Sequence, residues 1–223
     1  MTREFAVITA SDAVRTIGLD AWAGFELELR VSERGLIADC GNLALCLGDY
    51  FAMSTKPVNS GDRIDWASSL LVARRLTAAV VTLDELQYDG KTVTEGVDQC
   101  VSIWTEQSRV CNENDSSFLA CRFGDKIAVS PGALDDSGNI EGVRYSAPAR
   151  MSGWWLFAQS YDGSTDDFRS MTSMHVFEVL NQRRDLASYL GLSVGYAFRS
   201  RALQDRTEYQ VWHEDEVANQ PIP

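Results

Sequence analysis

Few residues of this 223-residue sequence have the types and spacing that catalysis requires. The two histidines, His175 and His213, are not part of a pattern such as H-x-x-x-H, which places two zinc ligands on one helix face. Ser130, Ser152 and Ser160 lie near glycines but outside a G-x-S-x-G turn. Neither G-x-x-x-x-G-K-[ST] nor G-x-G-x-x-G occurs. We therefore predict no catalytic residues, no metal ligands and no cofactor.

An acidic stretch beside two tryptophans is the strongest candidate for binding. Asp162, Asp166 and Asp167 follow Trp154 and Trp155 closely, and they lack the D-x-[DN]-x-[DN]-G order of a calcium loop. Such aspartates either form turns or meet a partner, and aromatic residues dominate many interfaces. The predicted partner-binding residues are Trp155, Tyr161, Asp162, Asp166, Asp167 and Phe168. The alternative interpretation is that the tryptophans alternate across a sheet, one of them in the core.

Strand patterns predominate in the elements that must position these residues. The segment 25–31 alternates apolar and acidic residues, with Glu26 and Glu28 expected to face water. Further strands are predicted at 78–83, 118–130 with a turn at Gly124, 140–146, 152–160 and 191–200, and short buried strands at 35–53.

Three segments have helical spacing. In 62–76, Trp66, Leu70 and Ala73 would share one face behind an Asp62 cap. A second helix follows a cap at Thr92 or Thr94, and a third covers 174–190 with a break near Arg184.

These patterns predict an α+β fold with mainly antiparallel sheets, a few packed helices and two subdomains, because strands and helices do not alternate regularly. The polar segment 109–117 is the expected boundary. The predicted divisions are 1–117, 118–205, and a C-terminal tail at 206–223.

The charge balance narrows the possible partners. The formal net charge is −12, which disfavours nucleic acid and anionic membranes and suits a basic protein partner. Solubility alone would also explain it. Residues 1–146 hold 13 basic and 22 acidic residues, which is most of the excess.

A cytoplasmic location is expected from the N-terminus and the cysteines. The first residues lack a secretory signal pattern, and no run approaches about 20 consecutive apolar residues. The five cysteines cannot all pair, which favours buried free thiols.

Three blocks in the second half resemble the immunity protein 33 family of bacterial polymorphic toxin systems. They are 126–146, 152–168 and 175–200. The family's V-S strand corresponds to Val129 and Ser130, and its S-G-W strand to Ser152, Gly153 and Trp154. Its acidic loop corresponds to Asp162, Asp166 and Asp167. Its Y-L turn corresponds to Tyr189 and Leu190, and its vG-aF strand to Gly195 and Phe198. The resemblance covers roughly residues 118–202.

This resemblance implies a non-enzymatic immunity protein. Such a protein binds a cognate toxin in the cytoplasm and neutralises it by occluding its active site. Two alternatives remain open: a hydrolase that reverses the toxin's modification of its target, and a regulatory scaffold with an apolar ligand pocket in the first half.

Overall fold

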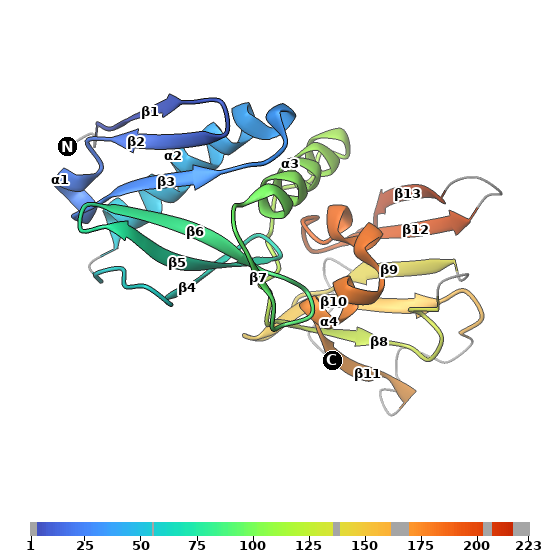
Figure 1. Cartoon of the computed structure of the whole chain (residues 1–223). Coiled ribbons are helices and arrows are strands. Elements are labelled where there is room, and N and C mark those ends of the chain that lie inside the picture. Colours follow the sequence, from blue (N-terminus) through green and yellow to red (C-terminus); the bar gives the residue numbers. More distant parts are fainter. Residues whose placement is uncertain (1–3, 55, 136–138, 162–169, 203–206, 216–223) are drawn as a thin grey trace. The chain divides into compact units, whose positions relative to one another are not determined.

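The computed structural model describes residues 4–54, 56–135, 139–161, 170–202 and 207–215. The chain divides into two compact units, Met1–Thr105 (unit 1) and Glu106–Pro223 (unit 2). The division lies within helix α3 (Asp98–Glu113), upstream of the polar segment expected to mark it. Both units combine a mixed sheet with a few helices, so the predicted α+β class with two subdomains is confirmed (Figure 1).

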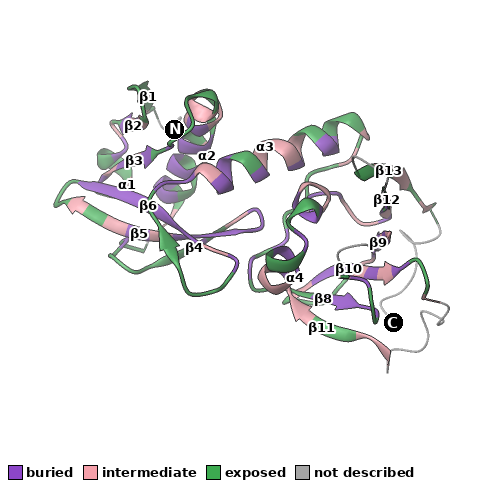
Figure 2. Ribbon diagram, turned by 45° about the vertical axis from the view of Figure 1, so that its right-hand side comes forward, coloured by how far each residue is buried: buried purple, intermediate pink, exposed green. Residues whose placement is uncertain are grey.

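Unit 1 is built on a seven-stranded sheet. Its strand order is β1-β2-β3-β6-β5-β4, with β7 added beside β6, and among its described strands only β3 and β6 pair in parallel. The strands are β1 (Ala6–Thr9), β2 (Ala13–Ile17), β3 (Glu26–Arg30), β4 (Arg63–Trp66), β5 (Ser69–Thr77), β6 (Val80–Leu86) and β7 (Val93–Thr94). β6 is buried along its whole length, as expected for a central strand (Figure 2).

Two predicted strands of unit 1 are confirmed as β3 and β6. On β3 the leucines are buried while Glu26 and Glu28 are partly exposed. Glu26 does not simply face water, since its carboxylate accepts hydrogen bonds from the Thr16 hydroxyl at 2.6 Å and the Gly18 amide at 2.7 Å.

The prediction of short strands at 35–53 is wrong, because this segment forms the long helix α2 (Ile37–Met53). Its buried residues recur at helical spacing: Cys40, Leu43, Ala44, Leu47 and Phe51. Gly48, which suggested a turn, instead makes room for the Phe5 ring, which a Cβ would overlap. Arg34–Met53 is apolar and long enough to cross a membrane by length and composition, and its buried side chains belong to the core of unit 1.

The predicted helix at 62–76 is also wrong. It forms the hairpin of β4 and β5, which turns at Ala67 with a positive φ of 49°. Trp66 packs edge-on against Trp104 of α3 at 6.4 Å, so the tertiary contact overrides the local helical spacing.

The helix predicted after Thr92 or Thr94 is confirmed as α3, but neither threonine caps it. Thr94 lies in β7, where its hydroxyl accepts a hydrogen bond from Gln87. The buried carboxylate of Glu85 accepts the amides of Gln99 and Cys100 instead, satisfying the first turn of the helix.

Four short helices complete the helical elements of the described residues. They are α1 (Asp20–Ala23) and the 3-10 helix η1 (Arg34–Leu36) in unit 1, and α4 (Val176–Gln182) followed by the 3-10 helix η3 (Arg184–Tyr189) in unit 2. The predicted helix at 174–190 is therefore present with its break, which lies at Arg183.

Unit 2 is built on a six-stranded sheet of order β11-β8-β10-β9-β12-β13, in which β8 and β10 are parallel. The strands are β8 (Lys126–Val129), β9 (Ile140–Arg144), β10 (Met151–Ala158), β11 (Thr172–His175), β12 (Tyr196–Ala202) and β13 (Thr207–His213). Only the second half of 118–130 is a strand, and β13 lies in the segment expected to be a tail.

One face of this sheet, here called the inner face, packs against η3. The Tyr189 ring lies 5.2 Å from that of Phe198, and the Trp154 indole donates to the Leu190 carbonyl at 3.3 Å. Leu156 and Ile140 are fully buried on the same side of the sheet. The hydrophobic core of unit 2 therefore lies on this inner face.

Arg144 is a buried cation on this inner face. Its guanidinium donates to the carbonyls of Ser152 at 3.1 Å, Leu119 at 2.6 Å and Leu190 at 3.2 Å, and also to that of Leu192. It lies 5.6 Å from the centre of the Trp154 ring. Burial lowers the pKa of Arg144 from its ordinary value.

Replacing Arg144 by Met should lower the free energy of unfolding by roughly 3 kcal/mol, because buried carbonyls would lose their donors. Urea unfolding followed by tryptophan fluorescence measures the change. Arg201→Met, at an exposed position on β12, is the matched control and should leave the midpoint nearly unchanged. Equal midpoints for the two variants would show that Arg144 does not stabilise unit 2.

Candidate partner-binding face

The backbone at Gly153 decides which tryptophan of β10 enters the core. Gly153 has a φ of +83°, and the pairing of β10 with β8 shifts register between Met151 and Trp155. A Cβ at this position would overlap with the carbonyl oxygen of Tyr145. Beyond the irregularity, Trp154 is buried and Trp155 projects from the opposite side of the sheet, which we call the outer face.

The strand register carries the outer face across four strands. Trp155 of β10 lies opposite Val143 of β9, which lies opposite Ala197 of β12 and then Trp212 of β13. The next row in the same direction contains Phe157, Glu141, Arg199 and Gln210. Side chains two residues apart share a face of a sheet, so both rows belong to the outer face.

Four half-buried aromatic residues form a continuous strip on this face: Tyr145, Trp155, Phe157 and Tyr161. Successive ring centres lie 6.0 Å apart for Tyr145 and Trp155, 6.4 Å for Trp155 and Phe157, and 5.9 Å for Phe157 and Tyr161. The first contact is edge-to-face and the other two are stacked. We call these four residues the aromatic strip.

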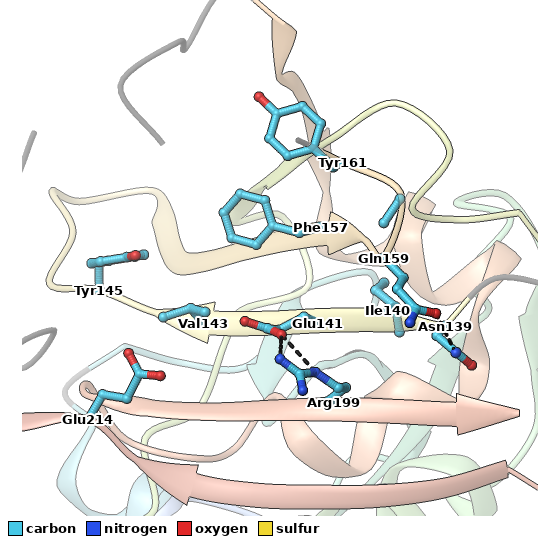
Figure 3. A pocket seen from close by; sticks show the side chains of 11 residues that line it. Asn139, Ile140, Glu141, Val143, Tyr145, Phe157, Gln159, Tyr161, Arg199 and Glu214 are labelled. Atoms are coloured by element: carbon cyan, nitrogen blue, oxygen red, sulfur yellow. Dashed lines mark hydrogen bonds and ion pairs between the residues drawn. The ribbon is translucent and has the colours of Figure 1, made fainter. Parts of the chain in front are cut away.

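A hollow of about 520 Å³ lies beside the aromatic strip (Figure 3). Phe157, Tyr161 and Tyr145 border it, with Val143 beneath and the charged residues Glu141, Arg199 and Glu214 along the strands opposite. At one end the Asn139 amide donates to the Gln159 side chain at 2.6 Å. The hollow thus combines aromatic rings with carboxylates.

The charges of the hollow are partly paired. Arg199 donates to Oε2 of Glu141, with the Nε bond at 2.8 Å, and its guanidinium lies 5.6 Å from the centre of the Trp212 ring. The Trp212 indole in turn donates to Oε1 of Glu214 at 2.7 Å. Burial, followed by the negative charges of Glu214 and Glu141, raises the pKa of Tyr145.

Of the residues predicted to bind a partner, the structure brings Trp155 and Tyr161 together on the outer face, both in the aromatic strip. The Tyr161 hydroxyl is hydrogen-bonded to that of Ser170 at 2.6 Å. Asp162, Asp166, Asp167 and Phe168 lie outside the described residues. Both interpretations of the tryptophans hold in part, since Trp154 is a core residue while Trp155 is half-exposed.

Sequence reasoning missed Tyr145, Phe157, Glu141 and Arg199. Phe157 was within reach, because it follows Trp155 by two residues and must share its face. The other three depend on how β9 and β12 pair with β10, which no local pattern specifies.

The described residues offer little for nucleophilic or metal chemistry. Among them no group of three or more His, Cys, Asp or Glu side chains could hold a metal ion. His175 Nδ1 lies 2.9 Å from the Gly124 carbonyl and His213 Nδ1 lies 3.1 Å from Asp215. Burial raises the pKa of the thiols, to about 12 for Cys40 and about 11 for Cys121, so both are protonated at neutral pH.

Comparison with known protein families gave a match within unit 2. Residues 106–214 match the family model described as the Imm33-like domain. Neither the curated proteins nor the solved structures gave a match. The match confirms the resemblance to the immunity protein 33 family in the second half of the chain, and it includes the end of α3 and β13 as well.

Gly153→Ala should lower the free energy of unfolding by roughly 2–4 kcal/mol, since a non-glycine residue at positive φ and an overlap with a backbone oxygen both cost energy. Chemical denaturation measures this loss. Gly124→Ala is the control, because nothing lies within 4 Å of a Cβ there. If both variants unfold at the same denaturant concentration, Gly153 does not constrain β10 as described.

Proposed function

We propose that this protein, whose residues 106–214 match the Imm33-like domain model, is an immunity protein that binds a cognate bacterial toxin in the cytoplasm and occludes its active site. The observation that carries the proposal beyond the family is the outer face of unit 2. There a sheet presents a row of half-exposed aromatic residues rather than a polar surface.

The aromatic strip has the composition of an interface centre. Tyrosine, tryptophan and arginine are the residues whose removal weakens protein complexes most, and they cluster where water is excluded. Trp155, Tyr145 and Tyr161 combine apolar rings with polar atoms, so they contact a partner without leaving an unpaired buried group. The Glu141–Arg199 pair lies directly beside them.

The acidic stretch follows the aromatic strip along the sequence. Tyr161 ends the aromatic strip, and Asp162, Asp166 and Asp167 follow it along the chain, together with Phe168. We include these four residues in the proposed contact region on sequence proximity. Their carboxylates would suit a basic toxin, since complementary charges speed association and exclude wrong partners.

The first test is survival. The gene is expressed in a sensitive host together with the toxin encoded by its neighbouring reading frame, and a complex is sought by co-purification. We expect protection together with a stable complex. Protection without any complex would favour an enzyme that repairs the target, and would contradict neutralisation by binding.

A pair of double variants places the interface. Trp155→Ala with Tyr161→Ala should raise the Kd by about 30-fold or more, the effect of losing about 2 kcal/mol at an interface centre. Tyr50→Ala with Met53→Ala removes two exposed side chains of α2 in unit 1 and should leave the Kd unchanged. Calorimetry gives both values, and circular dichroism verifies that each variant is folded. The reverse pattern would assign the interface to unit 1.

The acidic stretch has its own variant. Asp166→Lys with Asp167→Lys should slow association, most strongly at low ionic strength, because two attractive charges become repulsive. Stopped-flow mixing at two salt concentrations measures the rate. An unchanged rate and affinity would remove this stretch from the interface.

A further inference from the structure

The hollow beside the aromatic strip has one negative charge in excess. Glu141 and Glu214 contribute two carboxylates, whereas Arg199 contributes one cation. Arg199 engages only Oε2 of Glu141, and the Trp212 indole engages only Oε1 of Glu214. Among the described residues, one oxygen of each carboxylate is therefore left outside these bonds.

Both carboxylates act on the same region of the hollow. Figure 3 shows them on the Val143 side, facing Tyr145, with Phe157 and Tyr161 across the opening. The raised pKa of Tyr145 agrees with this arrangement. Besides burial, the negative charges of Glu214 and Glu141 both disfavour deprotonation of its hydroxyl. A group that enters here meets aromatic rings on one side and carboxylate oxygens on the other.

This pairing of surfaces selects for a particular chemistry. A guanidinium stacks on an aromatic ring and donates two parallel hydrogen bonds to a carboxylate, which an ammonium does less well. A related arrangement exists on the same face, since Arg199 lies over Trp212 while two of its nitrogens donate to a single oxygen of Glu141. The remaining carboxylate oxygens and the rings of Phe157 and Tyr161 offer a second place of the same kind.

We propose that this hollow receives one arginine side chain that projects from the surface of the partner protein. The inference rests on the proposed function for the identity of the partner, but not for the chemistry of the site. A volume of about 520 Å³ is ample for one long side chain. Because the hollow is partly open, a protruding loop of the partner can reach it.

The first experiment needs no toxin. N-acetyl-arginine amide is titrated into the full-length protein at constant ionic strength, and the backbone and indole signals are followed by two-dimensional NMR. Shifts should concentrate at 139–145, 157–161 and the Trp212 indole, while N-acetyl-citrulline amide, the uncharged isostere, should cause none. Equal shifts with citrulline, or no shifts with arginine up to about 100 mM, would overturn the proposal.

Two variants make the site specific. Glu214→Gln keeps an oxygen for the Trp212 indole but removes the charge, and should weaken the arginine probe at least about threefold. Glu208→Gln, at an exposed glutamate of β13, the strand that ends one residue before Glu214, is the matched control and should change nothing. Equal affinities for the two variants would contradict a role for Glu214.

The second experiment uses the complex. Arginines on the toxin are replaced one at a time by glutamine, and each change is combined with Glu214→Gln in a double-mutant cycle. One arginine should be coupled to Glu214 by about threefold or more. A stable, protective complex without any coupled arginine would overturn this inference while leaving the proposed function intact. The absence of any complex would instead contradict the proposed function.

Discussion

The buried guanidinium of Arg144 is the constraint on which unit 2 depends. It projects from β9 and is satisfied by carbonyls from three other parts of the chain: the segment after α3, the turn after η3, and β10. A buried cation is tolerated only where its N–H donors have hydrogen-bond acceptors. The segments that supply these carbonyls must therefore lie around Arg144. The Arg144 guanidinium thereby fixes coil segments that do not pair with any strand of the sheet.

Because Arg144 and Trp154 occupy the inner face, the next residue along β10 is committed to the other side. Successive side chains of a strand point to opposite faces, and the irregularity at Gly153, where φ is positive, sets which of the two tryptophans points inward. The core and the aromatic strip are therefore specified together, because each residue that points into the core is followed in the strand by one that points to the outer face. This explains how a short strand can both contribute to the core and present large aromatic side chains on the outer face.

Sequence patterns predicted the elements whose periodicity had one interpretation. Alternation in 25–31 left no choice but a half-buried strand, and Val101 and Trp104 lie in α3 as predicted. The failures were ambiguous locally. The spacing of Trp66, Leu70 and Ala73 fits one face of a helix. The segment forms a hairpin instead, in which Trp66 contacts Trp104, and this contact is not visible in the local sequence. Gly48 suggested a turn, because nothing near it in the sequence reveals that Phe5 will pack there.

The candidate site was predictable to the same extent. Trp155 and Tyr161 stood out by residue type, and the structure describes both on the outer face. Glu141, Arg199 and Glu214 come from strands far apart in the chain, and only the registers of β9, β12 and β13 bring them beside the aromatic strip. Charge distribution along the sequence was misleading for a similar reason. Residues 1–146 hold most of the acidic excess, which pointed to the first half as the source of steering.

The division into units changes that argument. Unit 1 has 9 basic and 15 acidic residues and unit 2 has 11 and 17, so each has a net charge of −6. Net charge therefore gives neither unit an advantage in attracting a basic partner. At physiological salt, interactions between exposed charges are screened beyond about 8 Å. What distinguishes a binding face must then be local: the order of rings, carboxylates and a single arginine over a few strands. On the outer face of unit 2 these groups lie within contact distance of one another, so short-range complementarity, rather than net charge, would set the choice of partner.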